Sequence, residues 1–242
     1  MFNFIWHTFF FDPVYNLLVL FIDILRNGDV GLAIIATVIV VKMVLLPLSI
    51  KAAKTQRSMR EIEPRLKQIK ITHKDNREEQ AKQMLAIYKE VNINPFASIV
   101  LLFLQIPIMF ALYFSVFSGG GVALPGINAA LLYSFIPEPT VITMNFLGMI
   151  DITGRSILLA VAAGVAQYFL TAMTLPKLEP REAGAAPSFK DDFIRNMYVQ
   201  MKYVMPVLIA GVAYSISTAI ALYFLVSSLV AIGQEFYIKK HR

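Results

Sequence analysis

The stretch GLAIIATVIVVKMVLLPLSI, residues 31–50, decides the fold, because it is apolar over the length that crosses a bilayer. One residue within it, Lys42, carries a charge. An ionisable side chain at the centre of a membrane helix costs about 2.5–3.5 kcal/mol on insertion scales, so its presence indicates a function. At about 1.5 Å per residue, Lys42 lies roughly 13 Å along the helix from Lys51, which predicts a position near mid-membrane.

Two interpretations of Lys42 stay open at this point. Its flexible stem could carry the ammonium to the membrane interface. Alternatively the ammonium is buried, and the other apolar runs contain no acidic residue before Glu235 to pair with it. A charge buried in this way requires water, backbone carbonyls or a carboxylate that arrives with a ligand. We therefore expect a wet cavity inside a membrane protein.

The composition indicates a polytopic membrane protein and excludes an ordinary soluble domain. Hydrophobic residues make up 57% of the 242 positions, charged residues only 16%, and the mean hydropathy is +0.63. The net charge of +6 is segregated along the chain, which favours membrane topology over nucleic-acid binding. The absence of cysteine excludes disulfides, thiolate metal sites and lipid attachment through cysteine.

Apolar runs and polar breaks predict an all-α membrane protein with five transmembrane helices. The predicted order is an outer interfacial segment with an amphipathic helix (1–30), a first span (31–50), a cytoplasmic helical hairpin (51–94), a second span (95–117), an extracytoplasmic loop (118–155), a third span (156–176), a cytoplasmic loop (177–201), a fourth and a fifth span (202–217 and 219–237) and a cytoplasmic tail (238–242).

Two of these assignments required a choice. Asp12 and Pro13 are typical of a helix start, and the helix predicted over 13–26 is too short and too polar to span, so we expect it to lie in the outer interface. A sixth spanning helix is the alternative. The apolar run 201–237 is too long for one span and fits two short ones with a turn near Ser217 and Thr218.

Residues 51–90 are charged and carry apolar residues at helical spacing on two segments separated by the polar break 72–76. This pattern predicts an antiparallel helical hairpin in water, with a kink at Pro64 in its first arm. The hairpin is either a docking surface or a solvated element without a partner. The expected packing positions are Met59, Ile62, Leu66, Ile69, Met84, Ile87, Tyr88 and Val91.

The basic residues predict the orientation of the chain. All but three of the 22 Lys and Arg residues fall in segments that the five-span topology places on one side of the membrane. The exceptions are Arg26, Lys42 and Arg155. Because basic residues are enriched on the cytoplasmic side, the N-terminus is expected outside and the C-terminus inside.

No motif in the chain is typical of an enzyme. We find no nucleotide-binding loop, no cluster of metal-ligating residues and no nucleophile beside a plausible base. None of the three histidines, His7, His73 and His241, shares a face with a carboxylate in a predicted span. The prediction is therefore a protein that is not an enzyme and needs no metal and no cofactor.

Four strings carry a family resemblance: IVVKMVLLPLSIKAAKTQRSMREIEPRLKQIK, YKEVNINPFASIVLLFLQIPIMFALYFSV, MPVLIAGVAY and ALYFLVSSLVAIGQE. In order and spacing they resemble the core of the YidC/Oxa1/Alb3 membrane protein insertases, from about residue 14 onward. The most specific segment contains Asn94, Pro95, Gln105, Pro107, Ala111 and Tyr113. The resemblance implies five core helices around a hydrophilic groove that is open to the cytoplasm and to lipid, together with a cytoplasmic helical hairpin.

The resemblance also implies site residues. Lys42 falls at the position of the family's groove arginine, so the charge is kept while the planar guanidinium is not. Tyr223 and Phe224 match an aromatic pair that faces substrate, with ordinary packing as the alternative. Candidate polar lining residues, which could instead only bond between helices, are Thr37, Ser49, Gln105, Gln167 and Thr171. The turn between the last two helices, often Pro-Ser-Gly in the family, is Ser217, Thr218 and Ala219 here.

The function that the resemblance implies is insertion of hydrophobic segments of newly made proteins from the cytoplasm into the lipid bilayer. The expected partners are nascent membrane proteins and the bilayer, with a Sec-type translocon and the ribosome as further candidates and no direct nucleic-acid function. The expected location is the bacterial cytoplasmic (inner) membrane. Two alternatives use the same features: a small-solute channel or transporter, and an assembly factor that does not insert its clients.

Overall fold

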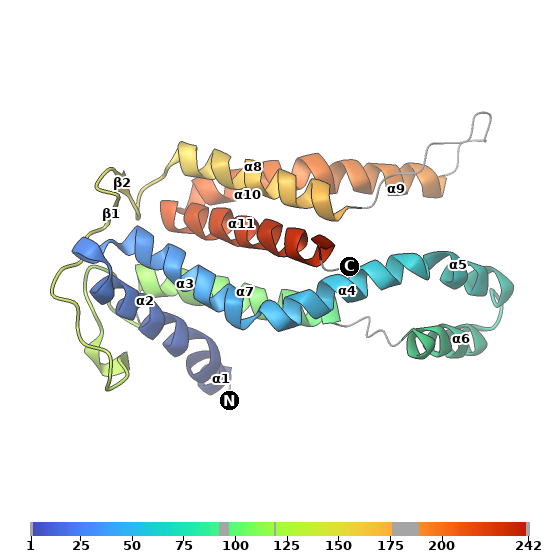
Figure 1. The fold of residues 1–242 in the computed structure, drawn as a ribbon, viewed down its shortest axis with the longest axis horizontal. Coiled ribbons are helices and arrows are strands. Elements are labelled where there is room, and N and C mark those ends of the chain that lie inside the picture. The colour runs from blue at the N-terminus through green and yellow to red at the C-terminus, as the bar shows by residue number, and fades with distance from the viewer. Residues whose placement is uncertain (1, 92–96, 119, 176–188, 241–242) are drawn as a thin grey trace. The chain divides into compact units, whose positions relative to one another are not determined.

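The computed structural model describes residues 2–91, 97–118, 120–175 and 189–240 of the chain (Figure 1). Nearly all of its regular structure is helical, which confirms the all-α fold class. The chain forms two compact units: a larger one from Met1–Lys42 and Ile108–Arg242, and a smaller one from Met43–Pro107. Asn94, Pro95 and residues 177–188 of the predicted cytoplasmic loop 177–201 lie outside the described residues.

The N-terminal helix is longer than predicted. Helix α1 (Phe2–Trp6), a π-helical turn (His7–Phe11) and α2 (Asp12–Ile24) follow one another without a break. The π turn, in which the amide of Asp12 donates to the carbonyl of His7, carries the helix past Pro13. The predicted length of this helix was therefore wrong: by length and composition, Asn3–Ile24 is long and apolar enough to cross a membrane. Its location in the outer interface stays a prediction.

A tight turn joins α2 to α3 (Val30–Val44). A 3₁₀ turn spans Arg26–Gly28, and both Asn27 and Gly28 have φ of +61°. A side chain at Gly28 would overlap the carbonyl oxygen of Val141, so this position requires glycine. Asp29 then caps α3, because its Oδ1 accepts a hydrogen bond of 3.0 Å from the amide of Leu32.

The loop between α7 (Ala97–Phe117) and α8 (Ile157–Thr174) is hydrogen-bonded to this turn. The amide of Thr143 donates to the carbonyl of Gly28 (2.8 Å), and the amide of Val30 donates to the carbonyl of Thr143 (3.1 Å). Within the loop, β1 (Asn145–Phe146) and β2 (Ile150–Asp151) form a short antiparallel pair after a 3₁₀ turn at Ala129–Leu131. The loop is thereby fixed to the start of α3.

Polar side chains of α2 fix an earlier part of the same loop. Asn16 is buried, and its amide group donates 2.8 Å hydrogen bonds to the carbonyls of Asp12 and Leu131. Its Oδ1 accepts from the amide of Tyr133 at 2.7 Å. The amide of Asn128 donates to the hydroxyl of Tyr15 at 2.9 Å. A polar residue is therefore required at position 16, because its side chain bonds loop backbone groups that would otherwise lack partners.

In the larger unit, α8 packs against both α10 (Met205–Ile216) and α11 (Thr218–Lys240) (Figure 1). Small residues allow this close approach: a Cβ at Gly164 would lie 2.9 Å from Cβ of Ala210 and 3.0 Å from the carbonyl oxygen of Pro206. The main core contains buried residues of α2, α3, α7, α8, α10 and α11. Helix α9 (Phe189–Val199) continues through a π turn (Gln200–Val204) into α10.

The apolar run 201–237 divides into two helices, as the sequence predicted. Ser217 is extended, with φ −172° and ψ 163°, and its hydroxyl accepts a 3.4 Å hydrogen bond from the amide of Ile220. The amides of Thr218 and Ala219 donate to the carbonyls of Gly154 (2.9 Å) and Ile152 (3.2 Å). These bonds satisfy the free donors at the start of α11, so the turn forms without the family's Pro-Ser-Gly.

The predicted span 31–50 is broken in the structure. Helix α3 ends at Val44, and α4 (Leu46–Glu61) begins after Leu45 with Pro47 in its first turn. A proline at the start of a helix needs no amide partner, whereas within one it removes a hydrogen bond. The sequence predicted a kink at Pro64, and the structure instead has a helix break at Ile62, after which α5 (Glu63–Thr72) begins.

In the smaller unit, α5 packs against α6 (Arg77–Glu90). Asn76 caps α6, since its side-chain oxygen accepts from the amide of Glu79 at 3.1 Å. Val91 is exposed (39%), whereas the other predicted packing positions lie in or against one cluster. Its buried residues are Ile62, Leu66 and Ile87, with Met59, Ile69, Met84 and Tyr88 packed against them.

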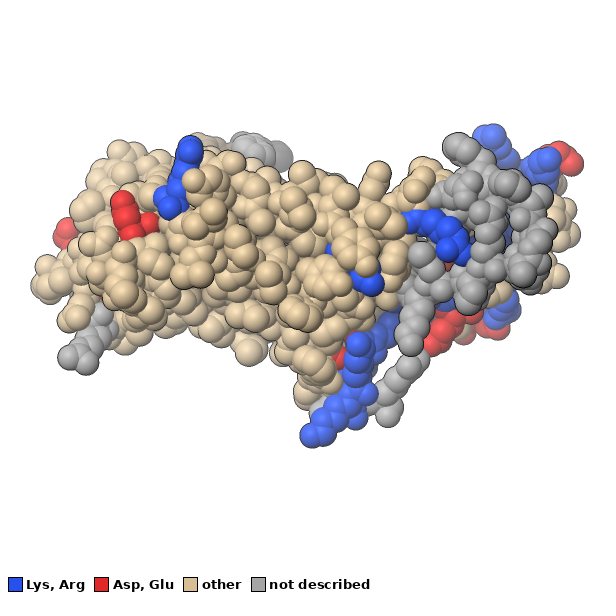
Figure 2. Space-filling model, turned by 90° about the horizontal axis from the view of Figure 1, so that it is seen from above, with Lys and Arg blue, Asp and Glu red and all other residues tan. Residues whose placement is uncertain are grey.

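Four of the described helices are long and apolar enough to cross a membrane, or up to five if the broken pair α3–α4 forms one span. The four are Asn3–Ile24, Ile157–Thr174, Arg195–Ile216 and Thr218–Lys240. Helix α7 contributes a shorter apolar segment, Phe103–Phe117. Figure 2 shows a broad surface without acidic or basic side chains, as expected of helices that face lipid.

Candidate functional site

Lys42 is half-buried and lies on α3, shortly before the helix ends at Val44. Its neighbours along α3 differ sharply in exposure. Thr37 is buried in the larger unit (1% exposed), whereas Met43 and Val44 are 55% and 71% exposed. Large apolar side chains exposed next to a lysine are typical of a helix that faces lipid on one side. Lys42 thus lies on an apolar helix, and its role as the groove charge stays a prediction.

Three predicted lining residues have different surroundings. The buried hydroxyl of Thr37 has no hydrogen-bond partner among the described residues, whereas most buried hydroxyls have one. Ser49 donates a 3.0 Å hydrogen bond to the carbonyl of Leu46 on its own helix. Ser49 and Gln105 are half-buried and belong to the smaller unit. Their role as groove lining stays a prediction.

Gln167 and Thr171 are brought together, with a third residue that the sequence did not single out. Gln167 of α8 donates from Nε2 to the hydroxyl of Thr171 (3.3 Å), and its Oε1 accepts from the hydroxyl of Ser228 on α11 (3.0 Å). Thr171 and Ser228 are buried. This chain of hydrogen bonds links α8 to α11, so Gln167 joins two helices whether or not it also lines a groove.

The Ser228→Ala substitution is expected to destabilise the α8–α11 contact by about 0.5–2 kcal/mol, because it leaves the carbonyl oxygen of Gln167 without its donor. The measurement is unfolding in detergent micelles. Ser227→Ala is the matched control, since the buried hydroxyl of Ser227 has no hydrogen-bond partner among the described residues and its loss should be neutral or stabilising. Equal effects of the two substitutions would contradict this assignment.

Helix α11 carries a further buried polar residue near its C-terminal end, Glu235, which is 8% exposed. It lies about two helical turns beyond Ser228 and therefore on the same face. One turn further, the ammonium of Lys239 donates to the carbonyl of Met173 at the end of α8 (3.4 Å). The polar pairs Ser227–Ser228 and Gln234–Glu235 in an otherwise apolar run are the sequence signal for this face.

The aromatic pair lies at the core of the larger unit. Tyr223 is 3% exposed and belongs to the main core, and Phe224 is partly buried against it. Their ring centroids are 5.6 Å apart at an interplanar angle of 69°, an edge-to-face contact. Packing therefore accounts for Tyr223, and contact of either ring with a substrate stays a prediction.

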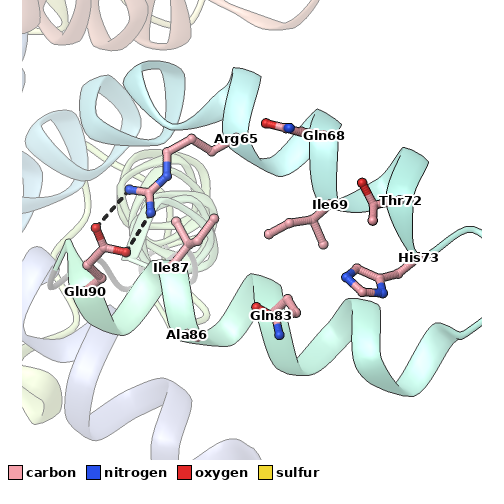
Figure 3. Close-up of a pocket in the computed structure, with 9 residues that line it drawn as sticks. All are labelled: Arg65, Gln68, Ile69, Thr72, His73, Gln83, Ala86, Ile87 and Glu90. Carbon is pink, nitrogen blue, oxygen red and sulfur yellow. Dashed lines mark hydrogen bonds and ion pairs between the residues drawn. The ribbon is translucent and has the colours of Figure 1, made fainter.

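Residues of α5 and α6 line an open, polar pocket of about 360 Å³ (Figure 3). Arg65 closes one end by a bidentate ion pair with Glu90, with Nη1–Oε1 and Nη2–Oε2 distances of 2.9 and 2.7 Å. His73 lies at the other end, near the turn between the helices (Figure 3). No group of three or more His, Cys, Asp or Glu residues able to hold a metal occurs in the part of the chain that the structure describes.

The ion pair predicts a pH dependence of the α5–α6 contact. The hydrogen bonds from Arg65, and then its charge, lower the pKa of Glu90 below its ordinary value of 4.5. A lowered pKa in the folded state stabilises the pair above that value, and the stabilisation is lost as the pH falls through the lowered pKa. Both side chains are solvated, so the effect is small.

Hydrogen exchange of the α6 amides, corrected for intrinsic rates, measures this dependence. Protection should fall on acidification of the native protein and fall less in Glu90→Gln, in which the charge is already absent. An acid-induced loss of the same size in Glu90→Gln would assign the effect to other groups.

The apolar helices define the class of the protein: a multi-pass α-helical membrane protein. Its polar side chains form hydrogen bonds within α8 and between α8 and α11. A family model described as 60Kd inner membrane protein matches residues 21–242. The chain belongs to this family, which confirms the resemblance that the sequence indicated. It is a multi-pass protein of the bacterial inner membrane.

Similar proteins carry the name Membrane protein insertase YidC. The chain is 30% identical over 214 residues to the one of Clostridium tetani, an alignment that covers 88% of this chain and 83% of the relative. It is 30% identical over 246 residues to the one of Alkalihalophilus pseudofirmus, covering 96% and 81%. The relative of Syntrophobacter fumaroxidans is 26% identical over 236 residues, covering 98% of this chain and 39% of the relative.

Proposed function

We propose that this protein inserts hydrophobic segments of newly made membrane proteins from the cytoplasm into the inner membrane, through a hydrated groove that carries Lys42. The observation that carries the proposal is the family match over 21–242, together with insertase relatives that align along most of their own length. The comparisons do not support a solute channel or a non-inserting assembly factor. Nascent membrane proteins and the bilayer are the partners.

The proposed role of Lys42 is electrostatic. A polar or acidic flank of a client crosses the membrane at lower cost if water and a positive charge accompany it, while the apolar part of the client enters lipid directly. For an acidic flank, the membrane potential adds about 2.3 kcal/mol per charge per 100 mV. No nucleotide hydrolysis by the protein enters this scheme.

The proposed orientation has the N-terminus outside and the C-terminus in the cytoplasm, supported by the segregation of Lys and Arg. The helix pair α5–α6 then faces the cytoplasm. Its exposed basic residues offer a charged surface to a Sec-type translocon or to the ribosome, the two further partners that we propose. These residues include Lys67, Lys70, Lys74, Arg77, Lys82 and Lys89.

Reconstitution tests the function directly. Liposomes containing only the purified protein should acquire a short single-span client in a protease-protected form, and empty liposomes should not. Solute flux without client insertion would favour the channel. Stable client complexes without insertion would favour the assembly factor. Either result would overturn the proposal.

A further inference from the structure

The loop between α7 and α8 exposes large apolar side chains at the apex of the β1–β2 pair. Leu147 and Met149 are 55% and 81% exposed, and residues 139–150 contain no Asp, Glu, Lys or Arg. Gly148 between them has φ of +74°, so the apex is a tight turn that presents both side chains outward. Large apolar side chains exposed side by side indicate a surface that contacts something other than water.

Contacts with α3 place one arm of the apex beside the membrane helices. A Cβ at Gly31 would lie 2.7 Å from Cγ of Phe146, so the phenylalanine ring rests directly on the first turn of α3. The amide of Leu147 donates a 2.8 Å hydrogen bond to Oδ2 of Asp29, the capping residue of that helix. The apex is therefore level with the point at which the apolar sequence of α3 begins.

The other arm is fixed to α11. The carbonyls of Ile152 and Gly154 accept hydrogen bonds from the amides of Ala219 and Thr218, in the first turn of that helix. Asp151, at the end of β2, turns its carboxylate to the amide and hydroxyl of Thr153, both at 2.8 Å. Both ends of the apex are thus attached to the first turns of helices that run into the membrane.

From this depth we infer that Leu147 and Met149 insert into the lipid boundary, between headgroups and acyl chains, of the leaflet in which α3 and α11 begin. The start of α8 also exposes apolar side chains, since Ile157 and Leu158 are each 69% exposed. Lipid is the occupant that the attachment of the loop to the first turns of α3 and α11 favours over a client or a second copy of the chain. The apex anchors the loop to the membrane surface.

Site-directed fluorescence tests the inference, and the absence of native cysteine makes single labels simple to place. Met149→Cys and Leu147→Cys are labelled separately with an environment-sensitive dye, and the full-length protein is reconstituted in phosphatidylcholine and phosphatidylglycerol vesicles. Phe169→Cys, at an exposed position on α8, is the membrane control. Asp75→Cys, in the turn between α5 and α6, is the aqueous control.

Both apex labels should show blue-shifted emission relative to the Asp75 label. A nitroxide placed near the lipid headgroup should quench them more strongly than one deep in the acyl chain, whereas the Phe169 label should respond more to the deeper nitroxide. Emission and aqueous quenching equal to those of the Asp75 label would overturn the inference. Protection from both lipid and aqueous quenchers would also overturn it, because it would identify a protein contact.

Discussion

Replacing Lys42 with alanine is expected to abolish growth rescue in cells depleted of their own insertase, whereas Lys42→Arg is expected to preserve it. In the proposed function, a client's polar flank needs a positive charge and its hydration within the apolar part of the membrane, and alanine supplies neither. Arginine keeps the charge and occupies the position at which the resemblance expects arginine. Loss of the charge should affect clients with acidic flanks most.

The assay needs controls for expression and folding. Met43→Ala changes the next residue, which is 55% exposed and apolar, and should leave rescue intact if only the charge matters. Membrane levels of each variant must match. Equal rescue by Lys42→Ala and the native protein across several clients would remove Lys42 from the mechanism while leaving the family assignment untouched.

The Gly28→Ala substitution is expected to lower the free energy of unfolding by about 2–5 kcal/mol. Part of this cost, about 1–2 kcal/mol, is the left-handed backbone, since Gly28 has φ of +61°. The remainder arises because the new methyl group overlaps the carbonyl oxygen of Val141, which must move and thereby strain the hydrogen bonds that Thr143 makes with Gly28 and Val30. Thermal unfolding in detergent micelles measures the loss.

Gly148→Ala separates the two contributions. Gly148 also has a positive φ, +74°, but a Cβ there would meet no atom within 4 Å. Its substitution should therefore cost only the backbone contribution, so the difference between the two variants reports the clash at Val141. If Gly28→Ala is no more destabilising than Gly148→Ala, the loop does not pack tightly on the turn between α2 and α3.

Local sequence patterns predicted those features of the fold that depend on apolar periodicity. Ile62, Leu66 and Ile87 pack as their spacing requires, and the run 201–237 divides near Ser217. The sequence did not predict the helix boundaries correctly near two prolines. Pro13 is typical of a helix start, yet a π turn before it makes the helix continuous through this position. Pro47 lies in an apolar run with the length of one span, yet a new helix begins there.

The site was less predictable because it depends on contacts distant in sequence. Lys42 stands out by itself, since a charge in an apolar run is a local signal. Ser228 does not stand out in the sequence, because serine is common in membrane helices. Only the structure shows that its hydroxyl bonds Gln167 of another helix. Likewise, Asn16 and Asp29 were identified as structural residues only by their bonds to residues more than one hundred positions away.

The bonds that join one loop to the first turns of α3 and α11 constrain how these two helices can move. Gly28, Asp29 and Val30 are attached on one side of the loop, and Thr218 and Ala219 on the other. A motion that preserves these bonds cannot translate one helix past the other at this end. It must be a tilt about the loop as a pivot, so displacements grow with distance from it and are largest at the opposite ends of the helices.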